Sequence, residues 1–366
     1  MIVALFFIGC LVMPVVGLQS FYQSISSYGV VNYPLFFGKG VNYNTVRMYH
    51  ISDDILHRDF SRFQRDGLSV ISLSLYWYRL EGNTRGDYDG IYEDGTPYGK
   101  SFLEHVKRFI RIANEYNLKV MVTFHTHWGD TSDWCTPDYV VDPETGKNVG
   151  HAIVKSEDMK QAFLDMVAHT VGYLKDEEIW AWALLNEPWG VDWKESFIDL
   201  IQRESALVKS IDGRPVTVRF VSSQKAWIGA DGKPHTRNHF TYVWNWDQRI
   251  FDALDFISFN PYIPEYPELY DAWLNITREN VIGSFNRGKR VWVTEFGHNS
   301  DDDVIQAENY EKALQVLQSL PIDGWLAWVW NQLHPSVPGN GWNILKDAEG
   351  NPRQAYYELL KYNPLS

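Results

Sequence analysis

Cysteine is almost absent from this sequence of 366 residues, which contains only Cys10 and Cys135. Cys10 lies in an apolar run at the N-terminus, so removal of that run leaves one cysteine. An intramolecular disulfide is then excluded, and the stability of the fold must come from a packed core.

Long apolar segments are equally scarce, and the clearest is residues 1–17, MIVALFFIGCLVMPVVG. It is shorter than the roughly 20 residues of a membrane-spanning helix, and Pro14 interrupts it. It contains no Lys or Arg, but Val15 and Gly17 supply small residues for a cleavage site. We interpret it as a cleaved signal peptide of a secreted protein whose domain is residues 18–366. A membrane anchor is the alternative, so membrane contact is expected only if the segment stays uncleaved.

Positive charge is in the minority, with 33 Lys and Arg against 46 Asp and Glu and a net charge of -13. Such a chain repels phosphates, so nucleic acid is not an expected partner, whereas neutral sugars are compatible with it. The sequence is rich in aromatics, with 16 Trp and 21 Tyr. These rings are suited to stacking on sugars, although aromatic-rich packing between helices and sheet is the alternative.

No low-complexity linker follows residue 19; instead, short β-rich runs alternate with amphipathic helical stretches. The clearest helices are predicted at Ser101–Glu115, Glu157–Leu174 and Glu308–Leu320. Eight alternating strands predict an α/β fold, a single-domain (β/α)8 barrel with long βα loops. The predicted strands are Leu35–Val41, Val70–Leu75, Lys119–His125, Ile179–Asn186, Pro215–Val221, Leu254–Asn260, Arg290–Phe296 and Trp325–Trp330.

Three of the predicted connections are long, and each follows the C-terminal end of a strand, the face where barrel active sites form. They span residues 126–154, 222–252 and 331–347. Their aromatics predict a substrate groove, with Trp128 and Trp342 as substrate-binding residues; aromatic anchors that hold the loops to the barrel are the alternative. These aromatics are Trp128, Trp134, Tyr139, Trp227, Trp244, Trp246 and Trp342.

Two of the apolar strands end in a glutamate. Ile179–Asn186 runs into Glu187, which Pro188 follows, and Val291–Thr294 runs into Glu295. Glutamates at the ends of two strands can face each other across the barrel mouth, the arrangement that glycoside hydrolysis requires. Either glutamate alone could be a structural ion-pair partner, but the pair favours catalysis.

The motifs Leu185-Asn-Glu-Pro188 and Val293-Thr-Glu-Phe-Gly297 resemble the acid/base and nucleophile motifs of clan A glycoside hydrolases, most closely those of glycoside hydrolase family 5, the cellulase and mannanase family. The resemblance extends from about Phe36 to Trp330. It implies a retaining mechanism in which Glu187 is the acid/base and Glu295 the nucleophile.

The same resemblance implies roles for further residues. Asn186 would hydrogen-bond the sugar 2-hydroxyl, and Tyr262 would donate to the nucleophile. His125 would line the cleavage subsite, and Trp330 would stack beneath the sugar ring. A core role for Trp330 is the alternative, with Trp328 in the subsite instead.

The sequence departs from the family pattern at two positions. Ser72 stands where the family usually has an arginine that fixes the nucleophile. Loss of this cation would raise the nucleophile's pKa unless another charge replaces it, and Arg47 and Arg219 are the candidates. Asn260, predicted to bind substrate, stands where the family often has histidine.

His125 and His127 have the spacing of a metal-ligand pair, but the later strands end in Ser222, Ser223 and Asn260 rather than in further ligands. We therefore predict no metal and no cofactor.

The sequence thus predicts a monomeric, secreted, retaining β-glycoside hydrolase. Its expected substrate is a polysaccharide or oligosaccharide, a β-1,4-linked glucan or mannan, which it cleaves within the chain. An exo-acting glycosidase or transglycosylase is the near alternative. A non-catalytic carbohydrate-binding barrel and a metal-dependent hydrolase are alternatives of other classes.

Overall fold

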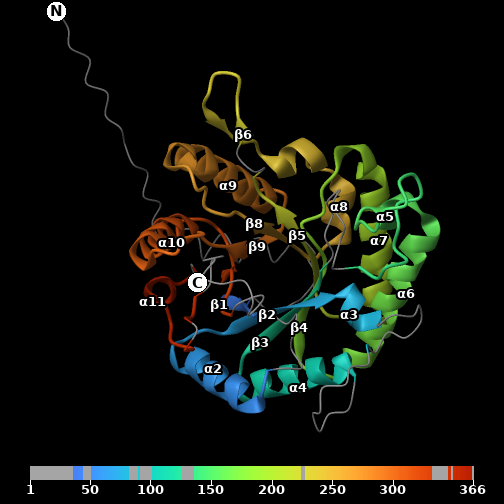
Figure 1. The fold of residues 1–366 in the computed structure, drawn as a ribbon, viewed down its shortest axis with the longest axis horizontal. Helices are drawn as coiled ribbons and strands as arrows, with labels where there is room; N and C mark the ends of the chain where they lie inside the picture. The colour runs from blue at the N-terminus through green and yellow to red at the C-terminus, as the bar shows by residue number, and fades with distance from the viewer. Residues whose placement is uncertain are drawn as a thin grey trace, which may run out of the picture. The chain divides into compact units, whose positions relative to one another are not determined.

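Eight parallel strands close into a barrel in the computed structural model (Figure 1). The structure describes residues 36–43, 51–81, 90, 101–125, 136–223, 227–331, 345–347 and 349–364, without the side chains of residues 81 and 125. The barrel order is β1-β10-β9-β8-β5-β4-β3-β2. The strands are β1 Gly38–Tyr43, β2 Val70–Tyr76, β3 Lys119–His125, β4 Ile179–Asn186, β5 Val216–Val221, β8 Phe256–Asn260, β9 Arg290–Phe296 and β10 Gly324–Ala327.

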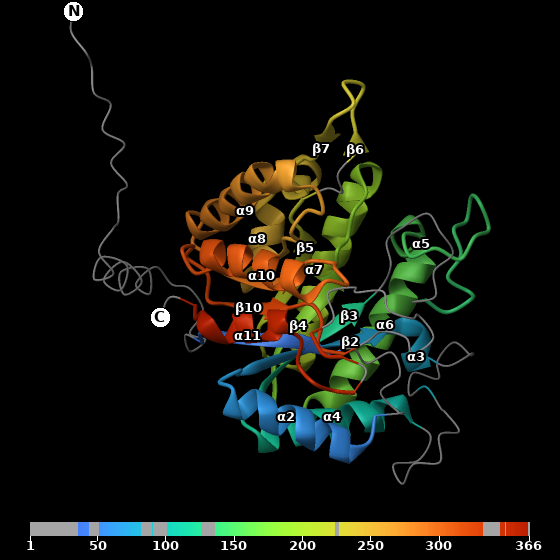
Figure 2. The same cartoon turned by 60° about the vertical axis from the view of Figure 1, so that its left-hand side comes forward.

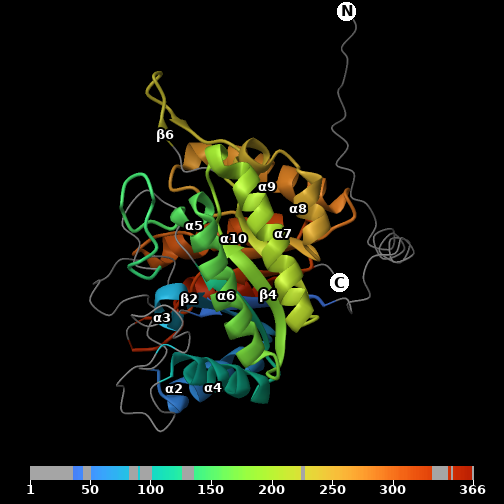
Figure 3. The same cartoon turned by 90° about the vertical axis from the view of Figure 1, so that its right-hand side faces the viewer.

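Helices in the chain between these strands surround the barrel (Figures 1 and 2). A short antiparallel hairpin, β6 (Trp227–Ile228) with β7 (Pro234–His235), projects beyond them in the views of Figures 1 to 3. The α-helices are α2 Asp53–Arg65, α3 Trp77–Glu81, α4 Phe102–Glu115, α5 Ala152–Lys155, α6 Glu157–Leu174, α7 Lys194–Ile211, α8 Gln248–Ala253, α9 Tyr270–Phe285, α10 Asp303–Leu317 and α11 Gln354–Lys361. The short helical turns are η2 Val191–Trp193, η3 Phe240–Trp244 and η4 Pro267–Leu269.

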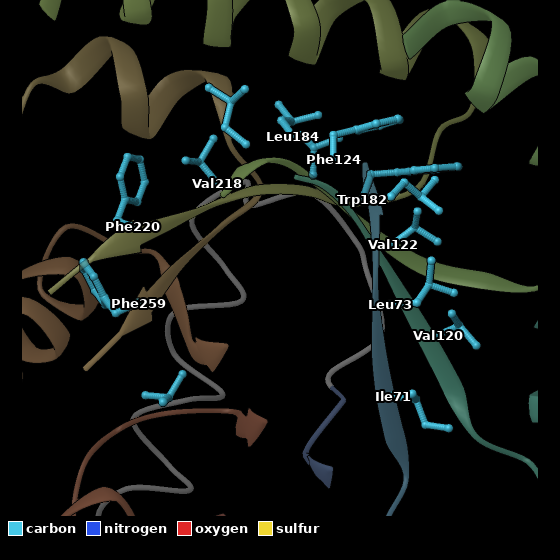
Figure 4. Packing of buried hydrophobic residues seen from close by; sticks show 14 of the residues in the cluster. Ile71, Leu73, Val120, Val122, Phe124, Trp182, Leu184, Val218, Phe220 and Phe259 are labelled. Atoms are coloured by element: carbon cyan, nitrogen blue, oxygen red, sulfur yellow. The ribbon is translucent and has the colours of Figure 1, made fainter. Parts of the chain in front are cut away.

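The hydrophobic core has two parts because side chains alternate along each strand. One part packs on the outer side of the strands, where Figure 4 shows residues from β2 to β5 and β8, among them Leu73, Val122, Trp182 and Phe259. A smaller, separate cluster comes from alternate positions of the strands, whose side chains point to the other face. It contains Val70, Met121, Ala181, Ala183, Phe256, Trp292 and Leu326. This smaller cluster lies on the opposite face of the strands, toward the barrel interior.

The strand predictions hold closely, and the barrel prediction is confirmed. Three strands match the predicted bounds, but β10 ends at Ala327 instead of Trp330. Helix α10 begins at Asp303 rather than Glu308, because the side chain of Asp302 accepts hydrogen bonds from the backbone N–H groups of Val304 and Ile305 and starts the helix there.

Gly40 allows β1 to approach β2, since a Cβ at this position would lie 1.8 Å from the backbone oxygen of Val70.

No helix among the described ranges is long and apolar enough to cross a membrane. The predicted signal peptide, residues 1–17, lies outside these ranges, and so do Cys135 and Arg47.

A buried carboxylate, Asp59 of α2, links β1 to the segments that follow β10. It accepts hydrogen bonds from Tyr43 Oη at 3.0 Å, Trp330 Nε1 at 2.8 Å and Lys346 Nζ at 2.9 Å. Arg58 Nε and Nη2 also donate to its other oxygen, Oδ1, at 3.2 and 3.1 Å. Two cations and two neutral donors thus satisfy one fully buried carboxylate, so removal of the carboxylate leaves all four without it.

We therefore expect Asp59→Ala to lower the free energy of unfolding by about 3–5 kcal/mol. Urea unfolding followed by tryptophan fluorescence measures the change. Asp54→Ala, on the same helix but exposed, is the matched control and should cost at most about 1 kcal/mol. Equal losses for the two variants would contradict the assigned role of Asp59.

Candidate active site

Glu187 and Glu295 both lie at the C-terminal ends of barrel strands, Glu187 after β4 and Glu295 within β9. Glu187 comes directly after β4, has the left-handed backbone angle φ 51°, and donates its N–H to the Arg219 carbonyl at 2.7 Å. A positive φ is unfavourable for a non-glycine residue and turns the chain sharply at the strand end. Glu187 remains partly exposed, whereas Glu295 is 3% exposed.

Glu295 is held by a cation and a phenol. Its Oε1 lies 2.6 Å from Arg219 Nη2, and its Oε2 accepts a short hydrogen bond from Tyr262 Oη. Both groups stabilise the carboxylate form and fix the direction in which the carboxylate points.

Arg219, on β5, crosses the barrel interior and is fully buried. Its Nη1 donates to Ser72 Oγ at 3.3 Å and to Thr123 Oγ1 at 3.1 Å. Its Nη2 donates to Asn42 Oδ1 at 2.9 Å and to the Thr294 carbonyl at 2.7 Å. One guanidinium therefore contacts β1, β2, β3 and β9 while its backbone belongs to β5.

These contacts identify the cation that the sequence left open between Arg47 and Arg219. Arg219 enters the barrel from β5, and the small side chain of Ser72 accepts one of its hydrogen bonds. The positive charge beside Glu295 is thus supplied from another strand.

Burial raises the pKa of the Glu295 carboxyl to about 7, and the positive charge of Arg219 opposes this rise. The charge of Glu187 also raises this pKa, whereas the hydrogen bond from Tyr262 lowers it. Burial, followed by the charges of Glu295 and Glu187, raises the pKa of Tyr262 well above its ordinary value. The two carboxyl groups are thus close enough to influence each other electrostatically.

Asn260 at the end of β8 links the two glutamate-bearing segments. Its Nδ2 donates to Glu187 Oε1 at 2.9 Å, and its Oδ1 accepts from Thr294 Oγ1 at 2.9 Å. Because both ends of the amide are engaged, Asn260 fixes the orientation of Glu187 relative to the residue that precedes Glu295.

Comparison with known proteins agrees with this geometry. Residues 37–334 match the family model described as cellulase, glycosyl hydrolase family 5. The chain belongs to glycosyl hydrolase family 5. It is a glycoside hydrolase, and its substrate class is therefore carbohydrate. No curated protein matches the sequence.

Several solved structures share the fold at low sequence identity. The endo-β-1,4-mannanase from Thermotoga petrophila is 16% identical with a TM-score of 0.67, covering 91% of this chain and 77% of that one. The endo-1,4-β-mannanase from Rhizomucor miehei is 16% identical with a TM-score of 0.61, covering 84% and 89%. The exo-β-1,4-mannosidase from Opitutaceae bacterium strain TAV5 is 15% identical with a TM-score of 0.65, covering 89% and 59%.

The prediction that Trp330 stacks beneath a sugar in this family 5 enzyme is wrong. Its side chain is fully buried, hydrogen-bonds Asp59, and packs on Phe63 and Tyr356 with ring centroids 4.8 and 5.1 Å apart. The strand β10 ends at Ala327, so the strict alternation of faces that the sequence reading assumed does not extend to Trp330. Trp328, the other residue considered for this place, is partly exposed.

Asn186, the last residue of β4, lies opposite Arg219 of β5 in the sheet register and is 4% exposed. It is thus next to both Glu187 and the residue that holds Glu295. His125 ends β3, but its side chain and the whole of His127, Trp128 and Trp342 lie outside the described part of the structure.

The described loop aromatics divide between the two alternatives. Trp244 is fully buried against Phe197 and Phe220, and Trp246 packs on Phe240 and Phe251, so both are anchors. Trp227, by contrast, is 40% exposed.

The residues that sequence reasoning missed are the polar ones inside the barrel. Asn42, Thr123 and Thr294 all contact Arg219, Thr294 through its backbone carbonyl. Thr123 and Thr294 fall inside predicted apolar strands, and Asn42 directly follows the predicted strand Leu35–Val41. Their signal was a polar side chain at one position of an otherwise buried strand, which is costly to bury unless it has a hydrogen-bond partner.

We expect kcat/KM to fall as the pH is lowered through about 7, because protonation of Glu295, whose pKa is about 7, removes the nucleophile. Tyr262→Phe removes a hydrogen bond that lowers this pKa, so the acidic limb should move to higher pH. The pH profile of kcat/KM on an aryl β-glycoside measures both. A limb that stays in place in the variant would contradict the assigned contact.

Removal of the cation should have a stronger effect. Arg219→Met is expected to move the acidic limb upward by about one pH unit or more, because a positive charge in contact with a carboxyl lowers its pKa by about 1–3 units. The double variant Ser72→Arg with Arg219→Ser returns an arginine to β2 and should restore part of the activity. Circular dichroism establishes that each variant folds, and an unchanged limb in folded Arg219→Met would overturn the assignment.

Proposed function

We propose that this family 5 enzyme is a retaining β-glycoside hydrolase in which Glu295 is the nucleophile and Glu187 the acid/base. The observation that carries the proposal is the environment of Glu295. Contacts with Arg219 and Tyr262 orient the buried carboxyl of Glu295 and stabilise its ionised form. The other glutamate, Glu187, is close enough to perturb the pKa of Glu295.

In the first step Glu295 attacks the anomeric carbon, and the bond to the leaving oxygen breaks as that oxygen takes the proton of Glu187. The product is a glycosyl ester on Glu295. In the second step Glu187 removes a proton from water, whose oxygen attacks the same carbon and releases Glu295. Two inversions at one carbon retain its configuration.

The surrounding residues have separate tasks in this proposal. Arg219 and Tyr262 stabilise the departing carboxylate when the ester breaks, and Asn260 orients Glu187. Asn186 is positioned beside Glu187 to hydrogen-bond the sugar 2-hydroxyl, a contact that strengthens in the transition state. His125, Trp128 and Trp342 remain proposed substrate contacts.

For the substrate we propose a β-1,4-linked glucan or mannan, cleaved within the chain by a monomeric enzyme that residues 1–17 direct to secretion. The similar endo-β-1,4-mannanase structures support this choice. Exo-action is the second candidate, supported by the similar exo-β-1,4-mannosidase structure. Product ladders from mannan, carboxymethylcellulose, mixed-linkage glucan and xylan distinguish the two and select the sugar.

We expect Glu295→Gln to lower kcat by at least about 10⁴-fold while the fold is kept, because the amide cannot form the ester. An NMR time course of the wild-type enzyme should show the β-anomer as the first product. Activity of the variant near that of the wild type would refute Glu295 as nucleophile, and an inverted product would refute the two-step mechanism.

Glu187→Ala should affect substrates according to their leaving group. The dinitrophenolate of a dinitrophenyl β-glycoside leaves without a proton, so this substrate should still form the glycosyl-enzyme. Hydrolysis of an unactivated disaccharide should instead slow by about 10²–10⁴-fold. Azide, which needs no general base, should accelerate turnover of the aryl glycoside and give a β-glycosyl azide. An equal loss on both substrates with no azide product would contradict the acid/base role.

A further inference from the structure

Exposed aromatic side chains gather on one sector of the barrel's C-terminal face. Five large aromatic residues among the described ranges are exposed: Trp189, Trp227, Tyr242, Tyr266 and Tyr357. The first four lie on the loops that follow β4, β5 and β8, which are consecutive strands in the barrel order. We call these four residues the aromatic sector.

The aromatic sector begins at the acid/base. Trp189 lies two residues after Glu187, is 48% exposed, and places its ring 6.5 Å from that of His239 at 67°. His239 directly precedes η3, which carries Tyr242, 53% exposed. The exposed rings therefore continue from the end of β4 onto the loop that follows β5.

The hairpin formed by β6 and β7 supports the outer part of the aromatic sector. His235 stacks on Trp227 with ring centroids 5.6 Å apart. The guanidinium of Arg237 lies 4.3 Å from the Tyr242 ring centre and 5.5 Å from that of Trp227, so it bridges the two rings. Strand β7 lies against η4, which directly follows Tyr266. The rings are thus held in place by neighbours while much of their surface stays exposed.

This combination matches the chemistry of a neutral sugar chain. Sugar rings present apolar C–H faces that stack on aromatic rings, and they present hydroxyl groups that accept hydrogen bonds from a guanidinium. Because the rings are already fixed, binding requires little additional ordering. A nucleic acid would also stack on aromatic rings, but the net charge of -13 opposes it.

We propose that the aromatic sector binds the leaving-group side of an extended glycan, beyond the bond that is cleaved. The side is defined by Glu187, because the acid that protonates the leaving oxygen must lie next to the leaving sugar. The inference therefore rests on the proposed function and deepens it: the substrate is a chain with several sugar units after the cleavage point.

Binding is measured without turnover. In a Glu295→Gln background, affinity electrophoresis in gels that contain soluble galactomannan or carboxymethylcellulose compares Trp227→Ala/Tyr242→Ala with its parent. We expect the dissociation constant for the retained polymer to rise about fivefold or more. Tyr357→Ala on α11, also an exposed aromatic, is the matched control and should bind like the parent. Trp227→Phe/Tyr242→Phe should keep most of the affinity.

Turnover gives the second readout. In the active enzyme, the ratio of kcat/KM on a β-1,4-linked hexasaccharide to kcat/KM on an aryl β-glycoside should fall about fivefold or more in Trp227→Ala/Tyr242→Ala. Unchanged polymer binding, or an equal loss on both substrates, overturns the aromatic sector as a glycan site. Failure of the wild-type enzyme to hydrolyse any β-glycoside instead refutes the proposed function, and the binding assay still tests the aromatic sector.

Discussion

The ion pair between Arg219 and Glu295 is the interaction on which the rest of the site depends. A guanidinium and a carboxylate are both taken out of water, and this is favourable only if their remaining hydrogen bonds are satisfied. The two Nη groups of Arg219 meet that requirement with oxygens from four strands. The polar residues that contact Arg219 inside the barrel are therefore explained by one buried cation.

The position of this cation also explains the departure at Ser72. A protein that fixes its nucleophile with an arginine needs the charge at one point in space, not on one particular strand. Arg219 reaches that point from β5, and a small hydroxyl at residue 72 makes room for it and accepts a hydrogen bond. A large side chain on both strands would compete for the same volume of a packed barrel interior.

The burial of Glu295 makes the folding stability depend on pH in the direction opposite to that of catalysis. Because the pKa of Glu295 is raised to about 7 in the folded protein, the neutral acid is the form that burial favours. The associated stabilisation is fully present below the ordinary pKa of a glutamate and is lost as the pH rises through about 7. Ionisation, which catalysis requires, thus works against folding, and Arg219 and Tyr262 limit that effect by favouring the carboxylate.

The sequence by itself determined the barrel and the two glutamates, because both follow from local patterns. Apolar strands alternate with amphipathic helices, and a carboxylate at the end of a buried strand stands out against its neighbours. Only the tertiary structure decided which arginine meets Glu295 and where Trp330 points. Arg219 and Ser72 are far apart in the chain and meet only across the closed barrel, and the side chain of Trp330 turns toward Asp59 because the regular strand has already ended. Contacts of this kind depend on the closure of the sheet and on where the strand alternation stops, and neither is encoded in a local pattern.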